Sequence, residues 1–368
     1  MFDRRLIQYF DWWLIGLTLM IGVIGFALIY SAVNADDITT QNDLHVKQMI
    51  WFAIGLAAMV CTFIFNYRNL DQWGGGIYLV SIILLICVLL YGKHVAGSRR
   101  WLAMGPLTLQ PSELVKISVI IILAKYYSKR ASIRGFTLKE LLVPMFIVVI
   151  PFLLIVKQPD LGTALLIVLI ASSITVYVKI ERRSMAWLIG SGAILVSLAW
   201  FFFLKGYQKQ RILTFLDPDR DPLGAGYHII QSKIAIGSGM LFGKGFLKGT
   251  QNALSFLPEQ HTDFILSVLA EEWGFTGTAI ILILYLFLLI WGLNIAHGCR
   301  DTFGTILAVG VTAMIFWQVF INIGMVMGLM PVVGVTLPLI SYGGSSVVTS
   351  LIGIGILMNI SMRRFMVE

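Results

Sequence analysis

Asp263 is the residue in this sequence whose position most suggests chemistry, because it lies where a long polar loop meets a long apolar run. Residues 254–274 read LSFLPEQHTDFILSVLAEEWG, so His261 precedes Asp263, and Ser267 and Glu271 follow it on one face of a predicted helix. Carboxylates are costly inside a bilayer, so this face is expected to line a protein cavity. Asp263 could instead cap the next helix, since Asp is a preferred N-cap residue, and a capping residue can also be a catalyst.

The composition is that of a polytopic membrane protein. The 368 residues are 58% hydrophobic and 12% charged, with a mean hydropathy of +0.86, which is more apolar surface than a soluble domain of this size can bury. The net charge of +8 is explained by positive cytoplasmic loops rather than by nucleic-acid binding. Cys61, Cys87 and Cys299 are scattered and predict neither a disulfide framework nor a metal site.

Ten apolar segments are each close to the length that crosses a bilayer, so we expect an all-α polytopic membrane protein with about ten transmembrane helices. Residues 1–368 are interpreted as a single membrane domain, with a large extracytoplasmic loop at 205–262 between helices 7 and 8. Both termini are expected in the cytoplasm, because lysine and arginine then concentrate on the inner side. The predicted spans are 12–31, 47–66, 73–91, 112–128, 141–157, 160–179, 186–204, 263–295, 304–327 and 338–360.

The predicted outer loop 92–111 contains an arginine pair, Arg99 and Arg100, which goes against this charge bias. One explanation is an anionic ligand, because the planar guanidinium binds phosphate through two parallel donors. The other is contact with lipid headgroups or solvent. Trp101, beside the pair, is expected to anchor the loop at the membrane interface.

Charged residues open predicted spans four and six at a similar depth in the outer leaflet. Glu113 and Lys116 are three residues apart on one helix face, and Asp160 begins span six. An ion pair between Lys116 and Asp160 would reduce the cost of burying either charge, and such a pair could be purely structural.

Polar residues also fall in the outer halves of spans nine and ten, namely Asn322, Ser341 and Ser345. Small residues there let helices approach closely, and their hydroxyls could also bind a ligand. Because all these candidates map to the outer side, two function classes remain: an enzyme acting on a lipid-linked anionic substrate, and a transporter of such a substrate. A transporter more often shows repeat symmetry and helices broken at the midplane, so the enzyme is favoured.

Four motifs resemble the SEDS family (shape, elongation, division and sporulation), and the resemblance covers essentially the whole chain. The most specific is NIGMVMGLMPVVGVTLPLISYGGSS at 322–346; RRWLAMGPLTLQPSE at 99–113, KQPDLGTALL at 157–166 and LPEQHTDFILSVLAEEWG at 257–274 also match. EQHTDF followed by AEEWG is more similar to the rod-shape branch than to the division branch, where EAHTDF and a GEE continuation are expected.

The resemblance implies a peptidoglycan glycosyltransferase that polymerises lipid II, an undecaprenyl-pyrophosphate-linked disaccharide–peptide, outside the bacterial cytoplasmic membrane. It matches Asp263 to an essential loop aspartate and Trp101 to a functionally important tryptophan. It matches Lys116 and Asp160 to a buried pair needed for activity. The implied partner is a class B penicillin-binding protein of the elongation machinery, which cross-links the polymer.

Glycosyl transfer needs a base for the acceptor hydroxyl, which Asp263 could be, and one base without a covalent intermediate predicts inversion at the donor sugar. The pyrophosphate leaving group could be stabilised by Arg99, Arg100, loop lysines or a divalent cation. Without an oxygen-rich cage, Mg²⁺ or Mn²⁺ would bind jointly with pyrophosphate, and no organic cofactor is expected. The sequence does not decide whether Asp263 acts as a base or as a metal ligand. A lipid II flippase, a scaffolding role and the division-specific paralogue also stay open.

Overall fold

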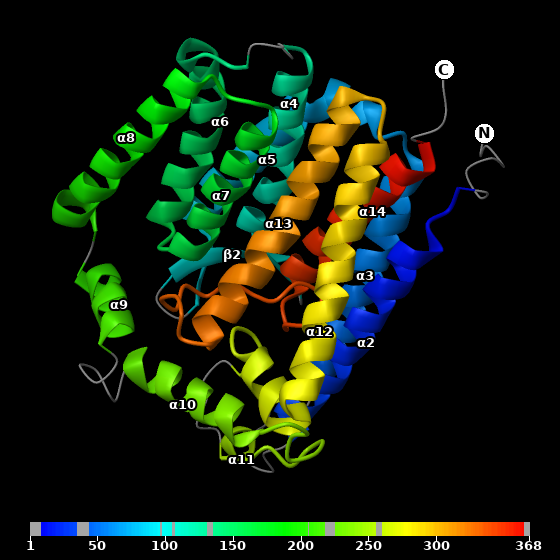
Figure 1. Cartoon of the computed structure of the whole chain (residues 1–368), viewed down its shortest axis with the longest axis vertical. Helices are drawn as coiled ribbons and strands as arrows, with labels where there is room; N and C mark the ends of the chain where they lie inside the picture. Colours follow the sequence, from blue (N-terminus) through cyan, green and yellow to red (C-terminus); the bar gives the residue numbers. More distant parts are fainter. Residues whose placement is uncertain are drawn as a thin grey trace.

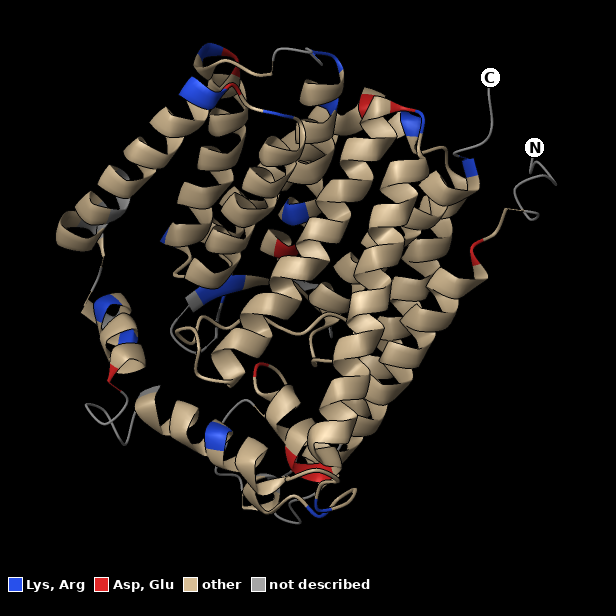
Figure 2. Ribbon diagram, in the orientation of Figure 1, with Lys and Arg blue, Asp and Glu red and all other residues tan. Residues whose placement is uncertain are grey.

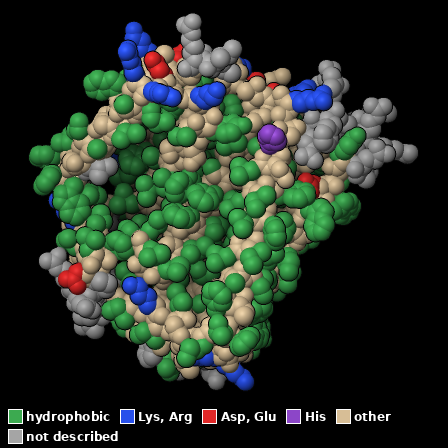
Figure 3. Space-filling view, in the orientation of Figure 1, with side chains coloured by type: hydrophobic (Ala, Val, Ile, Leu, Met, Phe, Trp, Pro, Cys, Tyr) green, Lys and Arg blue, Asp and Glu red, His purple; other side chains and the backbone are tan. Residues whose placement is uncertain are grey.

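The structure is a computed structural model that describes residues 9–34, 44–95, 98–104, 107–130, 135–204, 206–217, 225–254 and 260–363. Most helices stand side by side along the long axis of the molecule, while α9 (Gly206–Leu216) lies at its edge and α10 (Ala225–Ser238) lies across one end, where Ser232 donates to the Val326 carbonyl at 2.6 Å (Figure 1). Figure 3 shows apolar side chains covering the flank of this bundle. The predicted helical membrane architecture is therefore present.

Within the described ranges, seven helices are long and apolar enough to cross a membrane. The remaining three predicted spans, 112–128, 160–179 and 186–204, correspond to helices of 18, 17 and 17 residues: α5 (Pro111–Ser128), α7 (Leu161–Tyr177) and α8 (Arg182–Leu198). The seven long helices are α2 (Trp12–Asn34), α3 (Leu44–Ile64), α4 (Arg68–Tyr91), α6 (Leu138–Lys157), α12 (Ile265–Gly298), α13 (Thr302–Val326) and α14 (Gly344–Arg363).

The centre of the bundle is formed by α13 and α14. Of their most apolar windows, 72% and 89% of residues are buried, against 22% for α3, α4 and α6. Helices α3, α4 and α6 therefore lie at the periphery, whereas the polar residues of α13 and α14 lie in the interior.

The start of α2 and the end of α14 lie at one end of the bundle, opposite α10 and α11 (Thr250–Ala253) (Figure 1). Asp11 joins these two ends of the chain, because its carboxylate accepts hydrogen bonds from Trp291 Nε1 at 2.7 Å and from Ser361 Oγ at 3.1 Å. Figure 2 shows that lysine and arginine gather mainly at this same end.

Local sequence specifies the helix starts at the opposite end. Pro111 occupies the first turn of α5, where its missing N–H costs nothing. Asp160 is the N-cap of α7, and its carboxylate accepts from the Thr163 backbone N–H at 3.3 Å and the Thr163 hydroxyl at 3.0 Å.

The predicted span 263–295 is wrong as a single helix, because α12 consists of two helical stretches that meet at Gly274. This glycine has φ 66° and ψ −159°, which no helix allows, and Figure 1 shows the first stretch descending to the turn and the second rising from it. The loop after α10 supplies the missing backbone partners: Lys244 and Gly245 donate to the carbonyls of Glu271 and Glu272 at 3.0 and 2.9 Å. The membrane-spanning stretch therefore starts after Gly274.

Two predicted loops contain regular structure. Residues 92–111 form a small antiparallel sheet in the order β1-β2-β3, made of β1 (Lys93–Val95), β2 (Ser98–Met104) and β3 (Leu107–Leu109), so the fold is not purely helical. The loop 205–262 contains α9, α10 and α11, and follows a π-helical turn, η1 (Ala199–Phe203), at the end of α8.

Candidate active site

Asp263 lies in a turn immediately before α12 and is half-buried. The N-cap residue of α12 is Phe264, so the interpretation of Asp263 as a helix cap is wrong. Because the first stretch of α12 ends at Gly274, Asp263 and Glu271 lie at opposite ends of a short helix rather than along a spanning one. The carboxylate is thus presented by a turn, where a reacting group could approach it.

Three consecutive backbone carbonyls of this turn each accept a hydrogen bond from the C-terminal part of the chain. The bonds run from the Tyr342 N–H to the His261 oxygen (2.8 Å), from Ser341 Oγ to the Thr262 oxygen (2.6 Å), and from Asn322 Nδ2 to the Asp263 oxygen (3.0 Å). Helix α13 and the segment before α14 therefore hold the backbone of the turn.

Gly334 lies directly against the Asp263 carboxylate. A Cβ on Gly334 would be 3.3 Å from Asp263 Oδ2, and Gly334 has a φ of +72°, which favours glycine. Tyr342 approaches the same turn, with its ring edge-on to that of His261 at a centroid distance of 5.8 Å. Burial raises the pKa of Tyr342, which lies just before α14.

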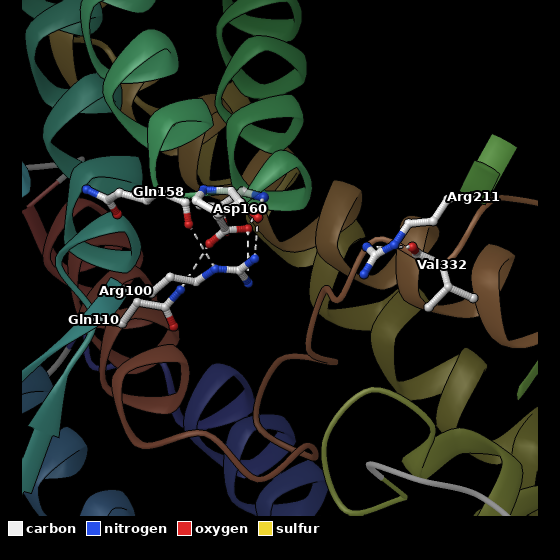
Figure 4. A network of polar contacts seen from close by, with 8 residues as sticks. Arg100, Gln110, Gln158, Asp160, Arg211 and Val332 are labelled. Atoms are coloured by element: carbon white, nitrogen blue, oxygen red, sulfur yellow. Dashed lines mark hydrogen bonds and ion pairs between the residues drawn. The ribbon is translucent and has the colours of Figure 1, made fainter. Parts of the chain in front are cut away.

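Arg100 and Asp160 form a second polar group (Figure 4). Arg100 Nη1 is 3.9 Å from Asp160 Oδ1, its Nε donates to the Gln158 carbonyl at 3.3 Å, and its Nη2 donates to the Pro159 carbonyl. Gln110 Nε2 donates to Asp160 Oδ2 at 3.2 Å. The Arg100 side chain is 30% exposed, so it joins β2 to the start of α7 while keeping some access to solvent.

The predicted ion pair between Lys116 and Asp160 is not present. Lys116 is fully buried and its Nζ lies 2.7 Å from Glu113 Oε2, one turn earlier on α5. The oxygens of Asp160 are already engaged by Thr163, Gln110 and Arg100, as described above. Each buried charge is therefore compensated, but the pairs are Lys116 with Glu113 and Asp160 with Arg100.

One segment joins the two polar groups. A Cβ on Gly162, two residues after Asp160, would be 2.4 Å from the Val333 carbonyl oxygen, so α7 packs tightly against the residue next to Gly334. Ser345 extends the link, since its Oγ accepts from the Gln110 N–H at 2.9 Å. The structure therefore has two polar groups, one of Asp263, Asn322 and Ser341 and one of Arg100, Asp160 and Ser345, and close packing at Val333 joins them.

The other predicted site residues lie on β2 and α5. Arg99 is exposed and Trp101 is half-buried on β2, where Trp101 pairs with Lys93 across the sheet. Glu113 lies in the first turn of α5, and Lys116 lies one turn further along that helix.

Sequence reasoning missed several residues that shape this site. Gly334 falls in the predicted motif 322–346 but was not singled out, and Gln110 precedes the first turn of α5. Arg211, on α9, donates from Nη1 to the Val332 carbonyl at 3.2 Å (Figure 4). The sequence signals available were that Gly334 lies between two valines and that Arg211 is a single arginine in a long loop.

The protein side chains alone do not form a metal site in the part of the chain that the structure describes, where no group of three His, Cys, Asp or Glu residues could hold an ion. Asp263 is a single carboxylate. A divalent cation would therefore need oxygen ligands from another molecule.

Comparison with known proteins agrees with this architecture. A family model described as "Cell cycle protein", whose name joins FtsW, RodA and SpoVE, matches residues 11–365. The chain belongs to this SEDS family. The match spans all the helices described above, so it covers the whole bundle rather than one motif.

Relatives of this SEDS protein include the peptidoglycan glycosyltransferase MrdB of Escherichia coli K12, which is 43% identical over 93% of this chain and 92% of its own. Stage V sporulation protein E of Bacillus subtilis is 39% identical over 95% and 96%. The peptidoglycan glycosyltransferase RodA of Treponema pallidum is 33% identical over 98% and 99%.

Two solved structures share the fold over nearly the full length of both chains. A chain from a peptidoglycan synthase complex, described for its structural coordination of polymerization and crosslinking, has a TM-score of 0.83 and 31% identity, covering 97% of this chain and 98% of its own. The rod-shape-determining protein RodA of Thermus thermophilus has a TM-score of 0.72 and 28% identity over 97% and 98%. The chain is thus an integral membrane protein with the fold of RodA.

Proposed function

We propose that this SEDS protein is a peptidoglycan glycosyltransferase that polymerises lipid II into glycan strands during cell elongation and rod-shape maintenance. Relatives that cover almost the whole chain carry this activity in their names, and the most similar of those reported above is MrdB. The observation that carries the proposal is the half-buried Asp263 carboxylate, presented by a turn whose backbone is fixed and packed against Gly334.

Asp263 acts as the general base for the acceptor hydroxyl. A carboxylate held on a rigid turn can accept the proton as the hydroxyl attacks the donor sugar, and a single base without a covalent intermediate inverts the anomeric centre. Fixing the turn beforehand keeps the oxygen in place during the reaction, which is how a positioned group contributes to rate.

The pyrophosphate leaving group is neutralised by cations at the edge of the site. Arg100 is partly exposed beside Asp160, and Arg99 is exposed on the same strand. A Mg²⁺ or Mn²⁺ ion bound jointly by pyrophosphate and Asp263 fits a site with one carboxylate, because Mg²⁺ commonly binds through one or two carboxylates plus substrate phosphates. When bound, such an ion would stabilise the negative charge that develops on the leaving group.

The remaining predicted residues stabilise the elements around the site. The pair of Lys116 with Glu113 compensates two charges inside α5, and Ser345 joins α14 to Gln110. Trp101 on β2 and His261 in the turn offer ring surfaces to the sugar or to the lipid interface.

The protein forms one domain of ten transmembrane helices in the bacterial cytoplasmic membrane, with both termini in the cytoplasm. Support comes from the lysines and arginines that gather at the end where α2 starts and α14 ends (Figure 2), as the positive-inside rule requires. Residues 205–262 and the Asp263 turn then face the outside, where lipid II is polymerised.

A class B penicillin-binding protein is the proposed partner, within the elongation machinery. The support is the similarity to a chain from a peptidoglycan synthase complex that coordinates polymerization and crosslinking. Such a partner would cross-link the strands that this protein produces.

The direct test is polymerisation by the purified protein alone. Fluorescent lipid II is incubated with the protein in detergent, without any second glycosyltransferase, and the products are separated by gel electrophoresis. Glycan chains support the proposal. A lipid II flippase would instead move labelled lipid across a vesicle membrane without forming polymer, and a scaffold would do neither.

A further inference from the structure

Asn322 is a completely buried amide in α13 that binds two separate segments of the chain. Its Nδ2 donates to the Asp263 carbonyl at 3.0 Å and to the Val335 carbonyl at 2.8 Å, and the residue is 0% exposed. Both amide hydrogens are therefore used for backbone carbonyls. A polar side chain buried in a membrane-spanning helix is costly unless its hydrogen bonds are made, so these two contacts offset part of the cost of burying the amide.

The orientation of this amide is fixed by its chemistry. Asn322 Oδ1 is buried and makes no hydrogen bond within the described part of the chain. Exchanging Oδ1 and Nδ2 would place an acceptor against two carbonyl oxygens, which are also acceptors. Asn322 therefore serves here as a donor to two carbonyls rather than as a general polar contact.

The two carbonyls that Asn322 binds lie on either side of the contact between Asp263 and Gly334. Asp263 carries the carboxylate, and Val335 directly follows Gly334, whose Cα faces that carboxylate. One nitrogen atom thus ties the turn to the non-helical segment against which the Asp263 carboxylate packs. Ser341 adds a second link farther from Gly334, since its Oγ donates to the Thr262 carbonyl and accepts from the Leu337 N–H at 2.8 Å. The Tyr342 N–H donates to the His261 carbonyl on the turn.

We propose that Asn322 is a positioning residue for Asp263: by holding the Asp263 and Val335 carbonyls together, it aims the carboxylate at the reacting hydroxyl. The proposal rests on the proposed function for its kinetic consequence. Its structural consequence, a turn that loosens when the amide is removed, does not depend on that function.

The chain contains a matched control in Asn359. This asparagine is 1% exposed in α14, and its Nδ2 also donates to two backbone carbonyls, those of Thr62 at 2.6 Å and of Phe65. It joins the end of α3 to the end of α14, at the opposite end of the bundle from Asp263. Substitutions at either asparagine remove two side-chain hydrogen bonds to backbone carbonyls, and those at Asn359 also affect the bond that its Oδ1 accepts from the Tyr67 N–H at 3.4 Å. Only substitutions at Asn322 affect the turn.

The experiment compares Asn322→Ala and Asn359→Ala in the purified full-length protein, with rates divided by the fraction of folded protein. For Asn322→Ala we expect the maximal polymerisation rate to fall at least tenfold, with the lipid II concentration for half-maximal rate changed less than twofold. For Asn359→Ala both values should stay within twofold of wild type. Equal rate losses in the two variants would overturn the proposal.

A second variant and a second measurement cover poor folding of the alanine variant. Asn322→Asp keeps the side-chain size but places a carboxylate against the two carbonyls, so it should lose the rate as Asn322→Ala does, whereas Asn359→Asp should not. Hydrogen–deuterium exchange then measures directly whether Asn322 holds the turn. The Tyr342 amide and peptides covering 260–266 should exchange at least tenfold faster in the Asn322 variants only.

The two measurements separate the two hypotheses. If the wild-type protein forms no polymer, the proposed function fails, and the exchange data still decide whether Asn322 holds the turn. If the wild type is active but exchange near 260–266 is unchanged in the Asn322 variants, the positioning role is wrong while the proposed function stands.

Discussion

Asp263 and Gly334 lie in direct contact, so that any side chain on Gly334 would meet the Asp263 carboxylate. A Cβ there would be 3.3 Å from Oδ2, tighter than most packed contacts, and the φ of +72° already disfavours other residues. The glycine thus leaves room for the carboxylate and permits the left-handed backbone of the segment beside it. Asp263, the candidate base, and Gly334, which packs against it, come from segments about seventy residues apart in sequence.

Replacing Gly334 by alanine is expected to reduce polymerisation about tenfold or more. The substitution adds backbone strain of about 1–2 kcal/mol and displaces the carboxylate of Asp263. Rates are measured with purified protein and fluorescent lipid II. Gly343→Ala is the control, because a Cβ at Gly343 would meet its neighbours at 3.6 Å or more. Wild-type activity in Gly334→Ala would show that the contact has no functional role.

The ion pairs seen in the structure predict which charges are coupled. Double-mutant cycles on thermal stability in detergent should give coupling energies of about 0.5–3 kcal/mol for Lys116 with Glu113 and for Arg100 with Asp160. Lys116 with Asp160 should be additive to within about 0.5 kcal/mol. Strong coupling between Lys116 and Asp160 would mean that the pairing described above is wrong.

Glu271 fastens the loop after α10 to the first stretch of α12. Its carboxylate is buried and accepts from Lys244 Nζ at 2.6 Å, from Thr250 Oγ1 at 3.1 Å and from the Gln251 N–H at 3.0 Å. Lys244→Met should therefore lower the free energy of unfolding by about 1–3 kcal/mol, less than for a fully buried pair because the lysine side chain is 27% exposed.

The control for this change is Lys248→Met, four residues along the same loop. Lys248 is exposed, and no hydrogen bond or ion pair of its side chain is found in the described structure, so its loss should change stability by less than about 0.5 kcal/mol. Thermal unfolding followed in detergent distinguishes the two variants. Equal stability of both would indicate that Lys244 adds nothing to the loop.

The helices could be predicted well from sequence, because a long apolar run has few alternatives in a membrane. The break in α12 could not, since GFTGTAI continues the apolar pattern and a glycine is tolerated within a helix until its φ is known. The strands between residues 93 and 109 are too short for an alternating pattern to be recognised.

The candidate site was predicted in its members but not in its contacts. Depth along a helix follows from residue count, so Lys116 and Asp160 could be placed at similar levels, but the direction in which each side chain points depends on packing. Asn322 and Ser341 were expected on the same side as Asp263, and the structure adds that they bind its backbone turn. Gly334 required the fold, because its role depends on a neighbour far away in sequence.

The proposed topology predicts the accessibility of cysteines in intact spheroplasts. In a background lacking Cys61, Cys87 and Cys299, Lys248→Cys should react with a membrane-impermeant maleimide added from outside. Arg182→Cys, at the start of α8, should react only after lysis. Both positions are exposed, so reactivity reports sidedness rather than burial. The opposite pattern would place Asp263 in the cytoplasm and exclude polymerisation outside the membrane.

The central claim is that the Asp263 carboxylate performs the chemistry, and one pair of variants tests it most directly. Asp263→Asn keeps the size and polarity of the side chain but removes the base. Asp301→Asn makes the same change at the N-cap of α13, where the side chain accepts from the Gly304 N–H at 3.1 Å and asparagine caps equally well. With purified, folded proteins and lipid II, the account predicts that Asp263→Asn forms no detectable polymer while Asp301→Asn polymerises at close to the wild-type rate. Polymerisation by Asp263→Asn at a rate comparable to wild type would contradict it.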